Sequence, residues 1–319
     1  MTFINSNLKI STFGGTHEKE IGVMISGFPA DFEIDMDSVQ DMLDRRRPGQ
    51  SELTTKRNED DIPLICSGIE GDKTTGDVIK VSFENKDIKN ADDDKDFVPR
   101  PGHGDFTYYC SSGEFNKGAT SARSTVGIVF AGAMCKQFLA EHGIFVNAKL
   151  VYPDKEIIKK AAAEGDSVGG IVEGNIIGLA AGFGDLSAGK IESRIAACIF
   201  NIQGVKGLEF GLGFEAAELR GSEMNDPFVV GEDGKVRTAT NNCGGLLGGL
   251  ATGSPVTFNV AFKPTPTIAK EQQSVNLKTL QPVSVESKKR SDPCIALRGS
   301  VVVEAAAAIA AADIILGQE

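Results

Sequence analysis

The sequence predicts a layered α+β fold, and three observations lead to this prediction. Segments with helical periodicity and segments rich in β-branched and aromatic residues both occur, but without the regular alternation of a βαβ repeat. The chain has 319 residues, of which 41% are hydrophobic, so it can bury a substantial core. No internal repeat or convincing linker is present, and we expect residues 1–319 to form one domain.

Five segments have helical character. Residues 37–43 place apolar side chains at helical spacing behind an Asp-Ser cap, and Pro48 ends this helix just after Arg45–Arg47. Residues 121–142 predict a long helix with Arg123 in its first turn, close to the positive end of the helix dipole. The other three helices are expected at about 155–163, 190–200 and 301–316.

Three segments have the composition of strands, because β-branched and aromatic residues cluster or alternate between turn signals. They are residues 78–83, 171–177 and 256–262. The acidic run 92–96 is the best candidate for a domain boundary, but such a charge run is more typical of a solvated loop.

Charge and composition exclude several classes of function. The formal charge is −11, so the mean field repels a nucleic-acid backbone and any anion has to be captured locally. The N-terminus lacks an export signal, and the most apolar stretch, 301–316, is interrupted by Glu304 and Asp313, so no membrane span is expected. The six cysteines form no Cys-x-x-Cys pair and indicate reduced core residues of a cytoplasmic protein.

The most informative residues are cations and histidines placed in glycine and proline turns. His103 follows Arg100 in Arg-Pro-Gly-His-Gly-Asp, His17 lies in Gly-Gly-Thr-His-Glu, and Arg45–Arg47 run into a Pro-Gly turn. Turns of this kind are too small to bury the side chains. We therefore predict a cationic pocket for a small polyanion, with proton transfer inside it.

Each of these residues also has a plain structural explanation. Arg45–Arg47 would complement the negative end of a helix dipole, and His17 or His103 could be a hydrogen-bonded turn residue. Arg123 lies at the wrong end of its helix for dipole stabilisation, which favours a bound anion there. The stiff loop Lys263–Thr267 suits a phosphate or an ordinary turn.

Three further features have no specific functional signal of their own. Arg290 and Asp292 could form a local salt bridge. The glycine pairs of residues 244–249 match neither a P-loop nor a dinucleotide-binding fingerprint. No Cys/His spacing of the metal-binding type is present, and His142 is typical of a helix cap, so no metal site is predicted.

Nine short segments, taken together and in order, resemble those of chorismate synthases. They are Thr12–Pro29, Arg45–Gly49, Lys73–Gly76, Arg100–His103, Ser121–Arg123, Gly204–Gly207, Gly244–Gly249, Lys263–Thr265 and Ser291–Cys294. Each segment is weak alone, but the set covers nearly the whole chain. The resemblance implies a β-α-β sandwich with helices between antiparallel sheets, assembled as a homotetramer.

The resemblance also implies a lyase that removes phosphate and the C6 hydrogen from 5-enolpyruvylshikimate 3-phosphate in an anti-1,4 elimination, giving chorismate. Such an enzyme needs reduced FMN although the reaction has no net redox change. NADPH is the candidate reductant of the flavin. The substrate carries two carboxylates and a phosphate, which explains why clustered arginines would be useful.

Residue roles carried over from the family are as follows. The catalytic residues would be His17, which protonates the departing phosphate, His103, which protonates or orients the flavin, and Asp292, the base working through flavin N5. The substrate anions would be held by Arg45, Arg46, Arg100, Arg123 and Arg290. FMN would be held by Ala119, Thr120, Ser121, Gln203, Gly204, Gly253, Lys263, Pro264, Thr265, Pro266, Thr267 and Arg290, and Arg46 matches a position associated with the nicotinamide cofactor.

The chain departs from the family pattern at four places. Gly-Gly-Thr-His-Glu stands at 14–18 instead of Gly-Glu-Ser-His-Gly, Ala119–Ser121 replace Arg-Ser-Ser, Ser291 replaces a histidine, and Glu52 stands where a basic residue is common. Two alternatives stay open, of which the second is motivated by these departures. One is a reductase that uses NADPH to reduce FMN, and the other is a non-catalytic binder of phosphorylated metabolites.

Overall fold

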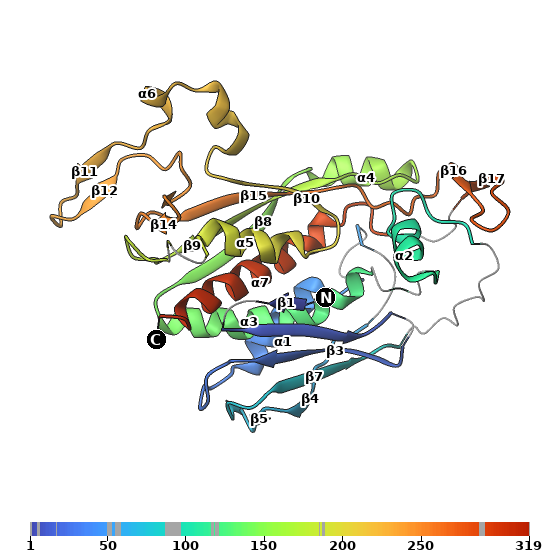
Figure 1. Cartoon of the computed structure of the whole chain (residues 1–319), viewed down its shortest axis with the longest axis horizontal. Helices are drawn as coiled ribbons and strands as arrows, with labels where there is room; N and C mark the ends of the chain where they lie inside the picture. Colours follow the sequence, from blue (N-terminus) through green and yellow to red (C-terminus); the bar gives the residue numbers. More distant parts are fainter. Residues whose placement is uncertain are drawn as a thin grey trace.

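The computed structural model describes residues 2–4, 7–16, 18–49, 53–54, 59–86, 97–115, 118, 121–184, 186, 189–286 and 291–318. A layer of helices lies between two antiparallel sheets, as Figure 1 shows. The predicted α+β layered fold is confirmed.

The first sheet has the strand order β1-β2-β3-β7-β4, with every neighbour antiparallel. Its strands are β1 (Thr2–Ile4), β2 (Lys9–Gly14), β3 (Glu20–Ser26), β7 (Ile79–Glu84) and β4 (Leu64–Ser67). Alternate residues such as Val23 and Val81 are fully buried, because one face of the sheet packs against the helices. The predicted strand at 78–83 is confirmed with a shift of one residue.

The second sheet covers the opposite face of the helical layer, with the order β10-β15-β9-β8. Its strands are β10 (Val205–Phe210), β15 (Val256–Phe262), β9 (Gly170–Ile177) and β8 (Phe145–Tyr152). In β15 the burial alternates residue by residue, and Phe258 and Val260 point into the core. The strands expected at 171–177 and 256–262 are therefore confirmed.

The helical layer consists mainly of α1 (Met36–Arg46), α3 (Thr125–Glu141), α5 (Ile191–Phe200) and α7 (Ala296–Ile315). Helix α4 (Lys155–Ala163) lies outside this layer, beside the second sheet (Figure 1). The third and fourth predicted helices match α4 and α5. The long helix expected from Ser121 begins instead with a 3₁₀ turn, η1 (Ala122–Ser124), capped by the Ser121 side chain. Helix α7 begins before the expected 301, because Gly299 lets it pass close to the Phe262 ring instead of ending it.

Helices α3 and α7 pack face to face and are apolar on nearly all sides, as expected for helices enclosed by two sheets. Their contact depends on small residues. A Cβ built on Gly132 would lie 2.3 Å from the Cβ of Ala305 and 2.8 Å from its carbonyl oxygen. The two backbones are therefore as close as a glycine permits.

Replacing Gly132 with alanine is expected to destabilise the protein by about 1–3 kcal/mol, since overpacking outweighs the gain in helix propensity. The midpoint of urea unfolding measures this. Gly221→Ala is the matched control, because a Cβ there meets nothing closer than 3.8 Å. Equal midpoints for the two variants would contradict the close contact.

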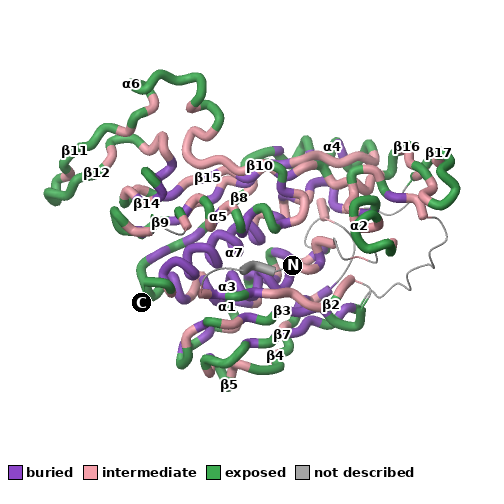
Figure 2. Tube along the Cα trace, viewed as in Figure 1, coloured by how far each residue is buried: buried purple, intermediate pink, exposed green. Residues whose placement is uncertain are grey.

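The remaining elements lie outside the sandwich. Between β10 and β15 the chain extends as an arm, defined here as residues 211–245, whose residues are mostly exposed (Figures 1 and 2). The arm contains η2 (Gly213–Glu218), α6 (Gly221–Met224), β11 (Phe228–Val230) and β12 (Val236–Thr238). Elsewhere lie α2 (Asp105–Ser112) and the short pairs β5 (Ile69–Glu70) with β6 (Lys73–Thr74), β13 (Leu246–Leu247) with β14 (Leu250–Ala251), and β16 (Gln272–Val275) with β17 (Pro282–Val285).

In the part of the chain that the structure describes, no helix is both long and apolar enough to cross a membrane. All six cysteines are free thiols, as the absence of a Cys-x-x-Cys pair predicted. Only Cys135, Cys198 and Cys294 are buried, however, while Cys243 is half-buried and Cys66 and Cys110 are exposed, so the prediction that the cysteines lie in the core is wrong for three of them. Burial raises the pKa of Cys135 well above its ordinary value, which is typical of an unreactive core thiol.

Candidate active site

The predicted site residues fall into four groups. His17, Ala119, Thr120 and Arg290 lie outside the described residues. Most of the others lie where the carboxyl end of α1, the start of α3, the start of α7 and the loops after α5 and β15 meet. Arg100 and His103 lie in the turn before α2, and Arg45 and Gly253 lie in other parts of the molecule.

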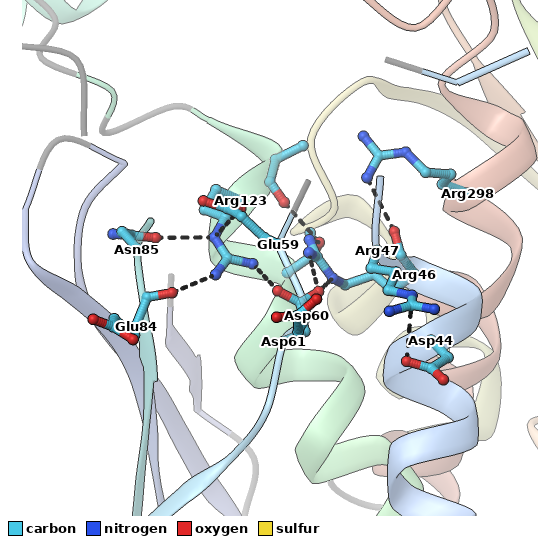
Figure 3. Close-up of polar contacts among 12 residues, drawn as sticks. Asp44, Arg46, Arg47, Glu59, Asp60, Asp61, Glu84, Asn85, Arg123 and Arg298 are labelled. Carbon is cyan, nitrogen blue, oxygen red and sulfur yellow. Dashed lines mark hydrogen bonds and ion pairs between the residues drawn. The ribbon is translucent and has the colours of Figure 1, made fainter. Parts of the chain in front are cut away.

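Arg46 is the last residue of α1 and is 3% exposed. Its Nε donates to Asp61 Oδ2 at 3.0 Å, and its Nη2 forms an ion pair with the same oxygen (Figure 3). Burial lowers the pKa of Arg46 to about 10, although Asp61 opposes the shift, so the guanidinium is still charged near neutral pH.

Arg123 lies in the 3₁₀ turn η1 and is 6% exposed. Its Nη1 pairs with Asp61 Oδ1, while its Nε lies 3.0 Å from Glu59 Oε2 and donates to Asn85 Oδ1 at 3.1 Å. Figure 3 shows this side chain enclosed between Asn85 and Asp61. The sequence predicted a bound anion beside Arg123 at the start of the helix. In the structure, the carboxylates of Asp61 and Glu59 pair with this guanidinium.

Asp292 is 8% exposed and pairs with Arg298, whose Nη2 lies 2.5 Å from Asp292 Oδ2. The Nη1 of Arg298 also donates to the backbone oxygen of Arg46 at 3.0 Å. The carboxylate therefore pairs with an arginine six residues later on α7. Arg298 was missed from the sequence because the predicted helix began beyond it.

A small cavity lies beside this network. It is lined by Arg46, Ala122, Thr125, Ile202, Gln203, Phe262, Ile295, Arg298, Gly299 and Val302. Within the described residues, Arg298 Nε and Gln203 Oε1 are buried without a hydrogen-bond partner. The amide orientation of Gln203 follows from its neighbours: Ser124 Oγ donates to Ser121 O at 3.0 Å, so it accepts from Gln203 Nε2 at 3.0 Å. One donor and one acceptor thus remain unmatched at the cavity.

The turn before α2 forms a second polar cluster. Asp105 is 1% exposed and accepts hydrogen bonds from the backbone N, Nε and Nη2 of Arg100 at 3.1, 2.7 and 2.9 Å. His103 Nδ1 lies 2.8 Å from Asp105 Oδ1. Burial alone would raise the pKa of Asp105, but the hydrogen bonds from His103 and Arg100 outweigh it and hold the pKa well below its ordinary value.

An ionised Asp105 has consequences for the histidine. A carboxylate can only accept, so the 2.8 Å contact is made by the Nδ1–H of His103. This tautomer leaves Nε2 as the atom that can exchange a proton. Arg100 and His103 also line an open groove with Phe106 and Ser274.

The two clusters are connected through Lys263. Its backbone N donates to Gly204 O at 2.9 Å, and its Nζ donates to the carbonyl oxygen of Gly102. Gly204 directly follows Gln203, which lines the cavity. The cavity, the flavin-binding candidates after α5 and β15, and the His103 turn therefore form one continuous region.

Two predicted residues are not brought to this region. Arg45 pairs with Glu304 at 2.7 Å, on the side of α1 that faces Lys136. Gly253 precedes β15, and a Cβ there would approach Ala181, whereas Lys263 follows the other end of the same strand. The roles predicted for Arg45 and Gly253 have no support from contacts within one chain.

The predicted excess of positive charge is smaller than the arginine count suggested. Among the described residues of the cavity network, Arg46, Arg123 and Arg298 face Glu59, Asp61 and Asp292. In the His103 turn, Arg100 is balanced by Asp105. Among the described residues of these two clusters, Lys263 is the cation that is not paired with a carboxylate, since its ammonium contacts the neutral carbonyl of Gly102.

The loop after β15 has groups that fit a phosphate-bearing cofactor. Thr265 Oγ1 is buried without a hydrogen-bond partner among the described residues, and the ammonium of Lys263 lies on the same loop. Together with the unmatched Gln203 and Arg298 groups, these residues fit a flat polar ligand that carries both hydrogen-bonding edges and a phosphate. FMN has both features.

Comparisons with known proteins bear on the family and the fold. The family described as chorismate synthase matches residues 8–153 and 149–316. The chain is 41% identical to the chorismate synthase of Methanosarcina barkeri over 342 residues, which cover 96% of this chain and 93% of the relative. It is 38% identical to that of Porphyromonas gingivalis, covering 98% of this chain and 95% of the relative. A crystal structure of chorismate synthase superposes with a TM-score of 0.78 at 25% identity, covering 99% of this chain and 93% of the other.

Proposed function

The chain belongs to the chorismate synthase family, and from this premise we propose that it converts 5-enolpyruvylshikimate 3-phosphate into chorismate. Family membership makes it a carbon–oxygen lyase acting on phosphates. The proposed step is loss of phosphate and the C6 hydrogen in an anti-1,4 sense. The observation that carries the proposal is the continuous region joining Arg46, Asp292, Lys263 and His103.

In this region, fixed charges would bind the substrate anions. Arg46 lines the cavity, while Arg100 and Lys263 lie beside the His103 turn. Charge-assisted contacts of this kind each contribute about 1.5–3 kcal/mol. Arg290 and Arg45 stay as predicted substrate ligands from the family resemblance.

We propose that FMN is held by Ser121, Gln203, Gly204, the 263–267 loop and the predicted Ala119, Thr120, Gly253 and Arg290. Reduced flavin would supply transient electron donation, which would let the phosphate leave C3 although the hydrogen to be removed from C6 is barely acidic. Lys263 and the Thr265 hydroxyl are suited to binding its phosphate. Gln203 would present an acceptor to the ring system.

The chain's own residues would then move protons. His103, oriented through Nδ1 by Asp105, can give or take a proton at Nε2. Asp292, oriented by Arg298, is the proposed base. The assignment of His17 as the acid for the departing phosphate continues to rest on the resemblance.

Three further proposals follow from the family. A homotetramer is expected, and a cytoplasmic location agrees with the six free thiols. NADPH is proposed as the source of electrons for the flavin. Because Arg46 is 3% exposed and bound to Asp61, its predicted contact with the nicotinamide cofactor has little support from its position.

An anaerobic assay tests the proposed function. With chemically reduced FMN, we expect release of one phosphate for each chorismate formed, and none with oxidised FMN or without flavin. Tight substrate binding with no phosphate release would instead favour the non-catalytic binder. Steady oxidation of NADPH in the presence of FMN but without substrate would favour the reductase.

A further inference from the structure

The connection between α4 and β9, defined here as the bridging segment (residues 165–169), contacts two separate loops of the candidate site. One is the 263–267 loop, which follows β15. The other is the turn 291–294, which carries Asp292 and precedes α7. These loops are distant in sequence, so one segment that contacts both can fix their relative position.

On one side, the bridging segment holds the 263–267 loop through Ser167. The Ser167 hydroxyl donates to the carbonyl oxygen of Thr265 at 2.7 Å, in a partly buried contact. Pro264 and Pro266 flank Thr265 and have no N–H, so the backbone of this loop has few donors of its own. The bond from Ser167 therefore constrains the direction of the Thr265 hydroxyl, which is buried without a partner among the described residues.

Three further contacts lie on the same side. Ala269 N donates to Gly165 O at 2.8 Å, and Lys270 pairs with Asp166 at 2.7 Å. The ion pair is partly exposed and contributes little. A Cβ on Gly169 would lie 2.5 Å from the carbonyl oxygen of the last residue of β15, so the bridging segment runs directly against the end of that strand.

On the other side, the bridging segment contacts the turn that carries the proposed base. Val168 N donates to Pro293 O at 2.8 Å, and the Cys294 thiol lies 3.6 Å from Gly169 O. Pro293 directly follows Asp292, and both residues are buried. Donors on two consecutive residues, Ser167 and Val168, thus hold one carbonyl of each loop.

We propose that Ser167 is a positioning residue, which aims Thr265 at the phosphate of FMN, and that the bridging segment fixes the 263–267 loop relative to Asp292. This inference rests on the proposed function, since it takes FMN as the ligand of the loop and Asp292 as the base. Ser167 acts through the Thr265 backbone. A loop that is ordered before the flavin arrives loses less conformational entropy on binding.

Ser167→Ala removes the donor to the Thr265 carbonyl. FMN affinity is expected to fall about fivefold to 20-fold, because the loop is then ordered only on binding. The affinity for 5-enolpyruvylshikimate 3-phosphate without flavin should stay within about twofold, since the proposed substrate ligands Arg46 and Arg100 lie outside these contacts. Ser167→Thr keeps a hydroxyl and should hold FMN affinity within about threefold of the wild type. Anaerobic titration calorimetry with reduced FMN, and with substrate alone, measures these affinities.

Ser67→Ala is the matched control. Its hydroxyl also donates to a backbone carbonyl, that of Val78 at 2.9 Å, but it lies on β4 in the first sheet, so FMN affinity should be unchanged. If Ser167 only supports the fold, Ser167→Ala would weaken the binding of FMN and of substrate together. That result would overturn the proposal, and so would an unchanged FMN affinity.

Amide hydrogen exchange tests the role of Ser167 without any flavin. The Ala269 N–H reports the contact between the bridging segment and the chain that follows the 263–267 loop. In Ser167→Ala, exchange at Ala269 is expected to accelerate about threefold to tenfold, and in Ser67→Ala it should be unchanged. Equal exchange rates at Ala269 in Ser167→Ala and the wild type would refute the positioning role.

The connection between the two loops has its own measurement in the wild-type protein. FMN is expected to slow exchange at Ala269 and also at Val168, whose N–H is bonded to Pro293 O. Slowing at Ala269 alone would show that the bridging segment does not join the loops. If the wild type neither binds FMN nor releases phosphate, the proposed function is wrong, whereas the flavin-free exchange at Ala269 still decides the role of Ser167.

Discussion

Replacing Asp292 with asparagine is expected to lower turnover about 10²- to 10⁴-fold while leaving substrate and FMN affinities within a few fold. The carboxamide has the same shape and still accepts a hydrogen bond from Arg298, but it cannot take up a proton. Asp292 lies 2.5 Å from Arg298 and is 8% exposed, so its geometry is fixed before substrate arrives. Single-turnover rates under anaerobic conditions, with separately measured dissociation constants, separate the two effects.

Removing the charge of Asp292 leaves Arg298 without its carboxylate, so the urea midpoint of the variant must also be measured. Asp44→Asn is the control, since the Asp44 side chain is 42% exposed and pairs with Arg47 near the end of the same helix as Arg46. If Asp292→Asn turns over at the wild-type rate, Asp292 is not the base. If affinity falls as much as turnover, its role lies in binding.

Much of the fold could be predicted because its signals are local. The alternation in residues 256–262 follows from one buried sheet face, and the alanine-rich α7 is apolar because both sheets enclose it. The start of α7 could not be predicted, since Gly299 resembles a helix terminator unless the approach to Phe262 is known. Helix α2 was not predicted either, because the glycines in the turn before it are typical of a break between elements.

The site was only partly predictable, because sequence shows which residues are cationic but not what neutralises them. Arg46 and Asp61 are 15 residues apart, and Arg123 and Asp61 are 62 apart. No local pattern joins them. Buried arginines are stable only with buried carboxylates, but the strand that follows Glu59 and Asp61, β4, is mostly exposed, so nothing local marked these two acids as buried. Arg298 could have been identified only by extending α7 toward Asp292.

Asp105→Asn is expected to reduce turnover about as strongly as loss of His103 itself, by about 10²- to 10⁴-fold. The pKa of Asp105 is depressed in the folded protein, so its stabilising contribution is present above the ordinary aspartate pKa and is lost only as the pH falls through the depressed value. At neutral pH it is an anion that accepts the Nδ1–H of His103. An asparagine amide would donate to Nδ1 instead, and would place the proton on Nε2.

A double-mutant cycle distinguishes orientation of His103 from general support of the turn. If Asp105 acts through His103, removing it in a His103→Ala background costs little further turnover, because the group it orients is already absent. Two independent losses that multiply would show that Asp105 acts mainly by holding Arg100, with which it shares three hydrogen bonds. The nitrogen chemical shifts of histidine-labelled protein report the tautomer directly, and only three histidines need assignment. An Nδ1–H signal for His103 in the wild type that moves to Nε2–H in Asp105→Asn would support the orientation. An Nε2–H tautomer in the wild type would contradict it, because Arg100 Nη2, 3.0 Å from His103 Nδ1, would then be the donor to that nitrogen.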